Sequence, residues 1–235
     1  SHIISISDTV TKTLPPLKKG QSTTIYNPFE LKRYKNNYNR KTYLNEVEGI
    51  NKNSIVVGFV GRLEHQKRPR IFIQIAAKLK EKYDNEINFI MLSGSQDKEF
   101  DEIHNYASNL NISKELKILG FKNNPEDYMS GFDLLIATSI NDGFGRSLVE
   151  AMLLGVPVIA SNSGGHREII KDGKNGYLVP PDDIETFVNK SLELLDNKAM
   201  MQTLTDRAHK DAINRFTVTQ HVSSVMEIYN QSFNK

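Results

Sequence analysis

The sequence of 235 residues contains no cysteine. This absence excludes disulfide bonds, thiolate metal sites and thiol nucleophiles, and it is compatible with a reducing compartment. The charges also nearly cancel, because 30 Lys and Arg residues stand against 28 Asp and Glu residues, for a net charge of +2. No strong electrostatic field therefore recruits nucleic acid or an acidic membrane surface, and any anion has to be bound by a local site.

Long hydrophobic runs are missing too. The longest uncharged stretch, residues 151–165, has 15 residues and is interrupted by glycine, proline and asparagine, whereas a spanning helix needs about 20 apolar residues. We therefore expect no membrane span. The chain begins Ser1-His2, with neither an initiator methionine nor an apolar signal segment, which favours a processed or truncated chain.

From residue 54 onward, short apolar runs alternate with helical patterns, which is typical of parallel strands joined by crossover helices. The runs predict strands at 55–60, 87–92, 116–119, 134–137 and 157–160, and a turn at 172–177 precedes a further short strand. They are continuous rather than alternating, as expected for strands covered on both faces. The pattern predicts an α/β fold with a doubly wound parallel sheet.

The two ends of the chain follow other patterns. Residues 1–27 predict a strand at 3–7, a helix to about 17 and a strand at 23–26, which are too few to close a core. Residues 28–53 lack apolar periodicity and are interpreted as a linker or surface loop. We expect the main domain at 54–216 and a final helix within 217–235.

Ligands of open parallel sheets bind beyond the carboxyl ends of the strands, so the loops that follow the strands are candidate sites. The first loop places Gly61, Arg62 and Lys67 just before a predicted helix. Cations there oppose the helix dipole and one another unless an anion lies between them. The alternative is a solvated basic loop, which is the interpretation we prefer for Arg68 and Arg70.

The second loop, residues 138–146, leads into a predicted helix that is apolar nearly all round and therefore buried. Glu150 on that helix needs a partner, which is either Arg146 at i,i+4 spacing, a hydroxyl-bearing ligand, or both. Asp142 is either the N-cap of the helix or a ligand-binding residue. The glycines on either side of Phe144 leave backbone N–H groups open to a ligand, which a simple cap does not require.

The third loop, residues 161–168, again places small residues before a helical turn. The Gly164-Gly165 pair is a weak signal by itself, and we assign His166 no role in proton transfer. The sequence contains no P-loop, no Gly-x-Gly-x-x-Gly, no His-Glu-x-x-His and no Asp-x-Asp motif. We therefore expect neither a metal nor a cofactor.

Together these motifs resemble the family 4, or "group 1", glycosyltransferases. The residues that carry the resemblance are Gly61-Arg62-Leu63 with Lys67, Asp142-Gly143-Phe144-Gly145 with Glu150, Gly164-Gly165 with Glu168, and Val179-Pro180-Pro181. The resemblance covers roughly 55–215 in the expected order. One departure is Asp142, which stands where the family's Glu-x7-Glu motif has its first glutamate and is one methylene shorter, so the catalytic rate is left open.

The resemblance implies a GT-B architecture of two Rossmann-like domains, of which this chain holds the C-terminal, donor-binding one. Residues 1–27 would then be the last elements of the N-terminal acceptor domain, and 217–235 the helix that returns toward it. The resemblance further implies that Arg62 and Lys67 clamp the donor diphosphate without a metal, with Asp142 as the third catalytic residue. The implied donor-binding set is Gly61, Arg62, Lys67, Leu119, Gly120, Asp142, Gly143, Phe144, Gly145, Arg146, Ser147, Leu148 and Glu150, with Glu150 on the ribose and 119–120 at the base.

The implied activity is retaining transfer of a hexose from a nucleoside diphosphate sugar to a glycan or lipid-linked acceptor, in surface polysaccharide synthesis. The implied location is the cytoplasm or the inner face of the membrane, with peripheral association through the N-terminal domain. We expect the chain alone to bind donor but to transfer sugar poorly, because half of the reaction geometry lies elsewhere. The alternative is a non-catalytic partner or sugar-recognition module of the same fold, for which Asp142 is the support.

Overall fold

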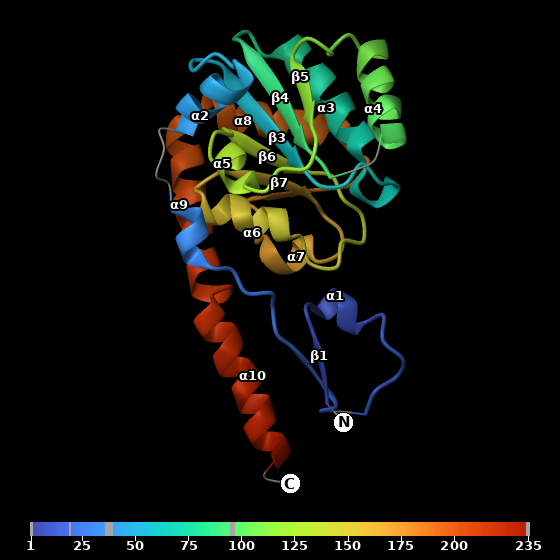
Figure 1. Cartoon of the computed structure of the whole chain (residues 1–235), viewed down its shortest axis with the longest axis vertical. Coiled ribbons are helices and arrows are strands. Elements are labelled where there is room, and N and C mark those ends of the chain that lie inside the picture. The colour runs from blue at the N-terminus through green and yellow to red at the C-terminus, as the bar shows by residue number, and fades with distance from the viewer. Residues whose placement is uncertain (1, 19, 36–39, 95–96, 234–235) are drawn as a thin grey trace.

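The computed structural model describes residues 2–18, 20–35, 40–94 and 97–233 and is built around a six-stranded parallel sheet (Figure 1). The strands are β3 (Ile55–Val60), β4 (Ile87–Leu92), β5 (Leu116–Leu119), β6 (Leu134–Ala137), β7 (Val158–Ser161) and β8 (Tyr177–Val179). Their order in the sheet is β5-β4-β3-β6-β7-β8. This order and the helices on both faces confirm the predicted doubly wound fold.

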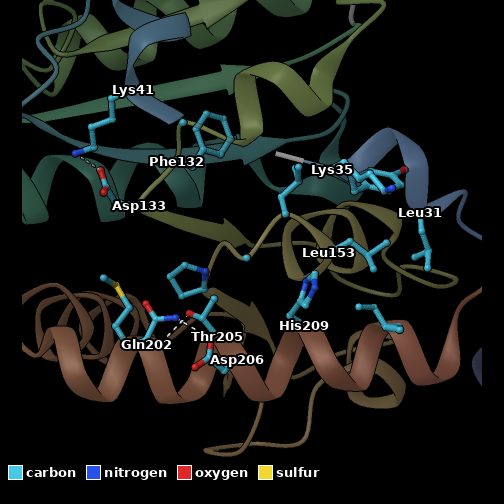
Figure 2. A pocket seen from close by; sticks show the side chains of 17 residues that line it. Leu31, Lys35, Lys41, Phe132, Asp133, Leu153, Gln202, Thr205, Asp206 and His209 are labelled. Atoms are coloured by element: carbon cyan, nitrogen blue, oxygen red, sulfur yellow. Dashed lines mark hydrogen bonds and ion pairs between the residues drawn. The ribbon is translucent and has the colours of Figure 1, made fainter. Parts of the chain in front are cut away.

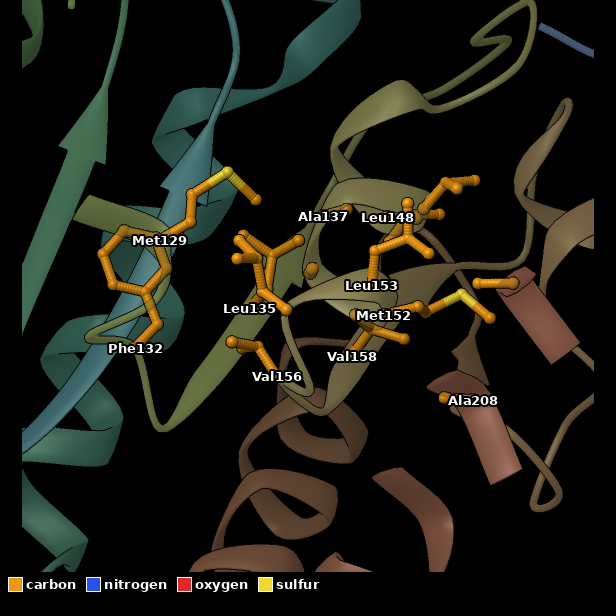
Figure 3. Close-up of a cluster of buried hydrophobic side chains, with 14 of the residues drawn as sticks. Met129, Phe132, Leu135, Ala137, Leu148, Met152, Leu153, Val156, Val158 and Ala208 are labelled. Carbon is orange, nitrogen blue, oxygen red and sulfur yellow. The ribbon is translucent and has the colours of Figure 1, made fainter. Parts of the chain in front are cut away.

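Helices cover both faces of the sheet because neighbouring residues of each strand point to opposite sides. One side carries α3 (Pro69–Lys82), α4 (Asp97–Asn109) and α8 (Ile184–Asp196), and the other carries α5 (Pro125–Met129) and α6 (Arg146–Leu153), with α9 (Lys198–Arg215) packed along α6. In β6, Leu134 and Ile136 are buried in the core on the α3 side of the sheet, whereas Leu135 and Ala137 are buried in the core on the α6 side. Figure 3 shows the core on the α6 side, where Leu148 and Met152 of α6 meet the strands. Burial on both faces is why the strands read as continuous apolar runs.

The strand order reverses direction between β3 and β6, which are hydrogen-bonded neighbours. From β3 the chain winds outward to β4 and β5, and from β6 it winds the opposite way to β7 and β8. The carboxyl ends of β3 and β6 therefore lie at a topological switch point, which is where open α/β sheets bind ligands.

The N-terminal unit consists of β1 (Ile3–Ser5), α1 (Asp8–Thr11) and β2 (Ser22–Thr24), with the two strands parallel. The first strand ends before the predicted Ser7, because the Ser7 side chain caps α1 and accepts from the N–H of Val10. The helix is also much shorter than predicted. Pro15 and Pro16 lack the backbone N–H that a longer helix requires, so the helical segment stops ahead of them.

Residues 28–53 differ from the predicted loop. They contain the short 3-10 helix η1 (Leu31–Tyr34) and the helix α2 (Arg40–Glu48). Phe29, Leu44 and Ile50 are buried in the core on the α6 side of the sheet. These apolar anchors are too widely spaced to produce a helical or strand period, so sequence periodicity could not reveal that the segment belongs to the core.

The last helix, α10 (Val218–Phe233), extends away from the sheet on the same side as the N-terminal unit (Figure 1). The backbone just before it pairs with Phe29, whose N–H donates to the carbonyl of Phe216 at 2.9 Å. Val222 and Tyr229 on the helix are about half exposed. In the part of the chain that the structure describes, no helix is both long and apolar enough to span a bilayer.

Candidate functional site

Three loops meet at the carboxyl ends of the central strands: residues 61–69, which include the 3-10 helix η2 (His65–Lys67), residues 138–146 and residues 162–168. The first two are joined where the N–H of Ile140 donates to the carbonyl of Gln66 at 2.9 Å. The second and third are joined where the N–H of Gly165 donates to the carbonyl of Asp142 at 2.7 Å. The three loops therefore form one hydrogen-bonded surface at the carboxyl ends of β3 and β6.

An ion pair joins the first loop to the second. Lys67 Nζ of the first loop lies 2.5 Å from Asp142 Oδ2 of the second, and both side chains are largely buried. His166 Nε2 of the third loop lies 3.8 Å from the same carboxylate oxygen. Burial by itself raises the pKa of Asp142, but the contacts with His166 and Lys67 outweigh it and leave that pKa lowered. Asp142 is therefore an ionised carboxylate held between two nitrogen-bearing side chains.

The structure rejects one alternative for Asp142. The N-cap of α6 is Gly145, in a left-handed conformation with φ of +94°, and no side chain caps the helix there. Asp142 Oδ1 reaches only the N–H of Phe144, at 3.4 Å. The carboxylate is therefore not used to cap the helix.

The cations of the first loop have different surroundings. The Arg62 side chain is 64% exposed and pairs with Glu64 at 2.8 Å. Arg70 is exposed, as expected. Arg68 contradicts the expectation of a solvated side chain, because it is only 16% exposed, donates to the carbonyl of Pro181 at 2.9 Å and ion-pairs with Asp182. Its partners come from a distant part of the chain, so the local sequence could not reveal them.

Glu150 lies on α6, largely buried. Arg146 Nη2 lies 3.6 Å from Glu150 Oε1, so the i,i+4 pair is present. Burial raises the pKa of Glu150, against the opposing charge of Arg146. Tyr34 of η1 lies close enough to this carboxylate to interact with it, and burial together with the charge of Glu150 raises the pKa of the Tyr34 phenol to about 12. Sequence reasoning missed Tyr34, because its segment carries no periodic signal.

The remaining predicted donor residues divide into two groups. Gly120 is exposed beyond β5, Leu119 is half-buried at its end, and Gly143 and Ser147 are half-buried at the second loop. The side chains of Phe144 and Leu148 point into the core instead, since the Phe144 ring stacks on Tyr26 with centroids 5.5 Å apart and Leu148 is 0% exposed. The N–H of Leu148 also donates to Gly145, so the structure does not bring Leu148 to the loop surface.

The glycine pair of the third loop has a packing function. A Cβ at Gly164 would lie 2.5 Å from the carbonyl oxygen of Asp142, and a Cβ at Gly165 would lie 2.6 Å from the Cα of Phe144. Any other residue would push the second loop away. The pair that was a weak signal in the sequence is thus what lets the Asp142 loop rest on its neighbour.

The N-terminal unit also reaches these loops. The Ser7 hydroxyl donates to the carbonyl of Gly143. The Glu168 carboxylate accepts from the N–H groups of Asp8 at 2.9 Å and Thr9 at 2.7 Å. The first turn of α1 is therefore fixed beside the second and third loops.

A cavity of about 740 Å³ lies elsewhere, before the amino ends of β6 and β7, between α9 and the residues Leu31, Tyr34, Lys35 and Lys41 (Figure 2). Its wall includes Leu153 and His209, and at one end Lys41 pairs with Asp133 at 3.0 Å. None of the predicted site residues lines it. Among the described residues, no three His, Asp or Glu side chains gather as metal ligands would.

Comparison with known proteins provides independent information. The family model described as "Glycosyl transferases group 1" matches residues 41–211. The UDP-Gal:alpha-D-GlcNAc-diphosphoundecaprenol alpha-1,3-galactosyltransferase of Escherichia coli is 26% identical over 212 residues, which cover 88% of this chain and 53% of that protein. The N-acetyl-alpha-D-glucosaminyl L-malate synthase of Bacillus anthracis is 27% identical, with 88% and 52% covered. The chain thus spans about half the length of these curated relatives.

Solved structures show the same similarity. Anabaena HepE in complex with UDP-glucose superimposes with a TM-score of 0.89 at 26% identity, over 98% of this chain and 64% of that one. The C-terminal domain of the group 1 family protein LpcC from Francisella tularensis superimposes with a TM-score of 0.72 at 21% identity, over 81% of this chain and 99% of that domain. The second likeness concerns the fold alone.

Proposed function

The chain belongs to the group 1 glycosyltransferases, and from this premise we propose that its three-loop surface binds the nucleoside diphosphate sugar donor of a retaining glycosyl transfer. The observation that carries the proposal is the Lys67–Asp142 pair, which brings a cation and an ionised carboxylate together on the loops that follow the neighbouring strands β3 and β6. A phosphate and a sugar hydroxyl are the ligand groups that such a pair complements.

The diphosphate would lie between Arg62 and Lys67, close to the start of α6. Arg62 is exposed and held only by the nearby Glu64, so it can turn to an anion at small cost. The leaving phosphate gains negative charge as the glycosidic bond breaks. Two cations and the N–H groups at the start of α6 then stabilise the transition state more than the bound donor, which is what accelerates a reaction.

The carboxylates would hold the neutral parts of the donor. Asp142 would accept from sugar hydroxyls, and Glu150 from the ribose hydroxyls, with Leu119 and Gly120 beside the base. The raised pKa of Glu150 supports this assignment, because a buried carboxylate short of hydrogen-bond donors gains free energy when hydroxyl groups reach it. Tyr34 would fix the orientation of Glu150 while the ribose binds.

We further propose a glycan or lipid-linked acceptor and a role in surface polysaccharide synthesis, in the cytoplasm or at the inner membrane face. The E. coli relative, a galactosyltransferase named for its diphosphoundecaprenol-linked sugar acceptor, supports this class of acceptor. The complex of HepE with UDP-glucose makes uridine diphosphate sugars the first donors to test.

Isothermal titration of the chain with UDP, UDP-glucose and a panel of other nucleotide sugars tests the proposal. We expect at least one donor to bind equally well with EDTA and with added magnesium, and Arg62→Met to weaken its binding. Arg70→Met is the matched control, because Arg70 is an exposed cation of the adjoining helix. Binding that EDTA abolishes and magnesium restores contradicts the metal-free clamp, and failure of the whole panel contradicts donor binding.

A further inference from the structure

His166 is a buried histidine directly beneath the second loop. It is 1% exposed and begins the short helix α7 (His166–Ile169). Its ring also fills the space beside Gly145, where an added Cβ would lie 2.8 Å from the imidazole Cδ2. The imidazole therefore packs against the backbone at the start of α6, too deep to touch a ligand.

The hydrogen bonds around His166 determine the position of one ring proton. Nδ1 lies 3.1 Å from the carbonyl oxygen of Ser161 and 3.2 Å from its hydroxyl oxygen. A carbonyl can only accept, and the Ser161 hydroxyl already donates to the carbonyl of Ser139. Nδ1 therefore carries a hydrogen and donates it to Ser161.

With Nδ1 protonated, the character of Nε2 decides how His166 acts on Asp142, 3.8 Å away. A neutral ring directs a lone pair at the carboxylate, whereas an imidazolium directs an N–H at it. The other charge on that carboxylate is Lys67. On its own helix, Arg167 is exposed and Glu168 binds α1, so neither competes for the ring.

We propose that His166 is a positioning residue whose Nε2–H holds the Asp142 carboxylate in its donor-binding orientation when the ring is doubly protonated. The inference rests on the proposed donor site and adds to it a coupling between donor affinity and pH. As the pH falls, the added proton strengthens the His166–Asp142 contact and places one more positive charge beneath the loop that faces the diphosphate.

The test is titration of wild type, His166→Gln and His209→Gln with UDP-glucose, or with the panel donor that binds best, from pH 5.5 to 8.0. A nucleotide sugar suits this range because the ionisation near pH 6 belongs to a terminal phosphate, which it lacks. His209 is a matched control on α9, since its Nδ1 also lies near a carbonyl, that of Met152, at 3.2 Å. Thermal melting of each variant establishes that it folds.

We expect wild type to bind more tightly at pH 5.5 than at pH 8.0, and His209→Gln to behave like wild type. His166→Gln should weaken binding about tenfold at the acidic end, the scale of one charged contact, and flatten the pH profile. In an Asp142→Asn background the same change should have little further effect, because the two residues act as a unit.

Three results overturn the inference: a His166→Gln profile that matches wild type, a loss that is equal at every pH, or full additivity with Asp142→Asn. His65→Gln is titrated in the same series. If the pH profile of donor affinity flattens in His65→Gln but not in His166→Gln, the pH dependence belongs to the exposed first loop, and the inference is overturned as well. Failure of wild type to bind any donor instead counts against the proposed function, so the two failures are distinguishable.

Discussion

Asp142 and Glu150 form the Asp-x7-Glu pair of one loop and helix, yet they lie in opposite electrostatic surroundings. Asp142 has Lys67 and His166 beside it, and its pKa is lowered. Glu150 is buried on α6 with Arg146 farther away, at 3.6 Å, and its pKa is raised. The loop thus stabilises the charged form of Asp142 before a ligand binds, whereas burial on the helix destabilises the charged form of Glu150.

This difference separates two ways in which a site prepares for its ligand. At the loop, Lys67 and Asp142 already contact each other, so their arrangement is fixed before a ligand binds. The interactions that the ligand makes have to compensate for any change in that contact. At the helix, the ligand supplies hydrogen bonds that the fold does not, so affinity and stability oppose each other. A neutral substitution at Asp142 should therefore lower the stability of the protein, whereas one at Glu150 should weaken donor binding without lowering stability.

The largest effect should come from Lys67→Met. It removes a cation of the proposed diphosphate clamp and leaves Asp142 without its nearest partner, so donor affinity should fall by about 2–5 kcal/mol, the usual cost of truncating one member of a desolvated charge pair. Titration calorimetry with the donor measures it, and Lys82→Met, at an exposed ion pair on α3, is the control. Equal affinity in Lys67→Met would place the diphosphate elsewhere.

Glu150→Gln should have the next largest effect. Donor binding should weaken by about 1.5–3 kcal/mol, the scale of a hydrogen bond to a charged group, while the unliganded protein melts at the same temperature or higher, since a buried charge is removed. Calorimetric titration and thermal melting of the same sample give both values. Normal binding with a much lower melting temperature would instead mark Glu150 as a structural partner of Arg146.

Gly165→Ala tests whether the loop region depends on its close packing. The added Cβ would lie 2.6 Å from the Cα of Phe144. We therefore expect the free energy of unfolding, measured in urea, to fall by about 1–3 kcal/mol, the usual cost of overpacking. Donor binding should weaken as well, because Asp142 shifts with its loop. Gly94→Ala is the control, since its Cβ would meet Phe121 at an ordinary 3.5 Å. An unchanged Gly165→Ala would show that the third loop moves freely.

The smallest effects should appear in the pH dependence of stability. Because the pKa of Asp142 is lowered, its stabilisation is present above the ordinary aspartate pKa and is lost as the pH falls through the folded-state value. Because the pKa of Glu150 is raised, ionising it lowers stability as the pH rises.

Urea unfolding from pH 3.5 to 7 should therefore find Asp142→Asn less stable than wild type at pH 7 and Glu150→Gln equal or more stable. Both differences should shrink toward acid pH. A difference of the same sign for the two variants would contradict the comparison between loop and helix.

The sequence was informative where a property repeats along the chain. Continuous apolar runs predicted the strands, and glycine and charge after the strand ends predicted the three loops that meet at the carboxyl ends of the central strands. It was uninformative where a side chain depends on a distant partner. Arg68 was misjudged because Asp182 lies far along the chain, and Tyr34 and the buried position of His166 could not be found because isolated residues leave no period.

The hydrogen bonds from the backbone N–H groups of Asp8 and Thr9 to Glu168 affect the order in which the chain folds. The carboxylate and the two amides it binds are separated by about 160 positions, and the Ser7 contact with Gly143 is almost as remote. A ribosome that makes the chain from its amino end releases β1, α1 and β2 long before their anchors exist. These elements stay exposed until β7 and α7 have been made, and so they are among the last of the described elements to reach their final place.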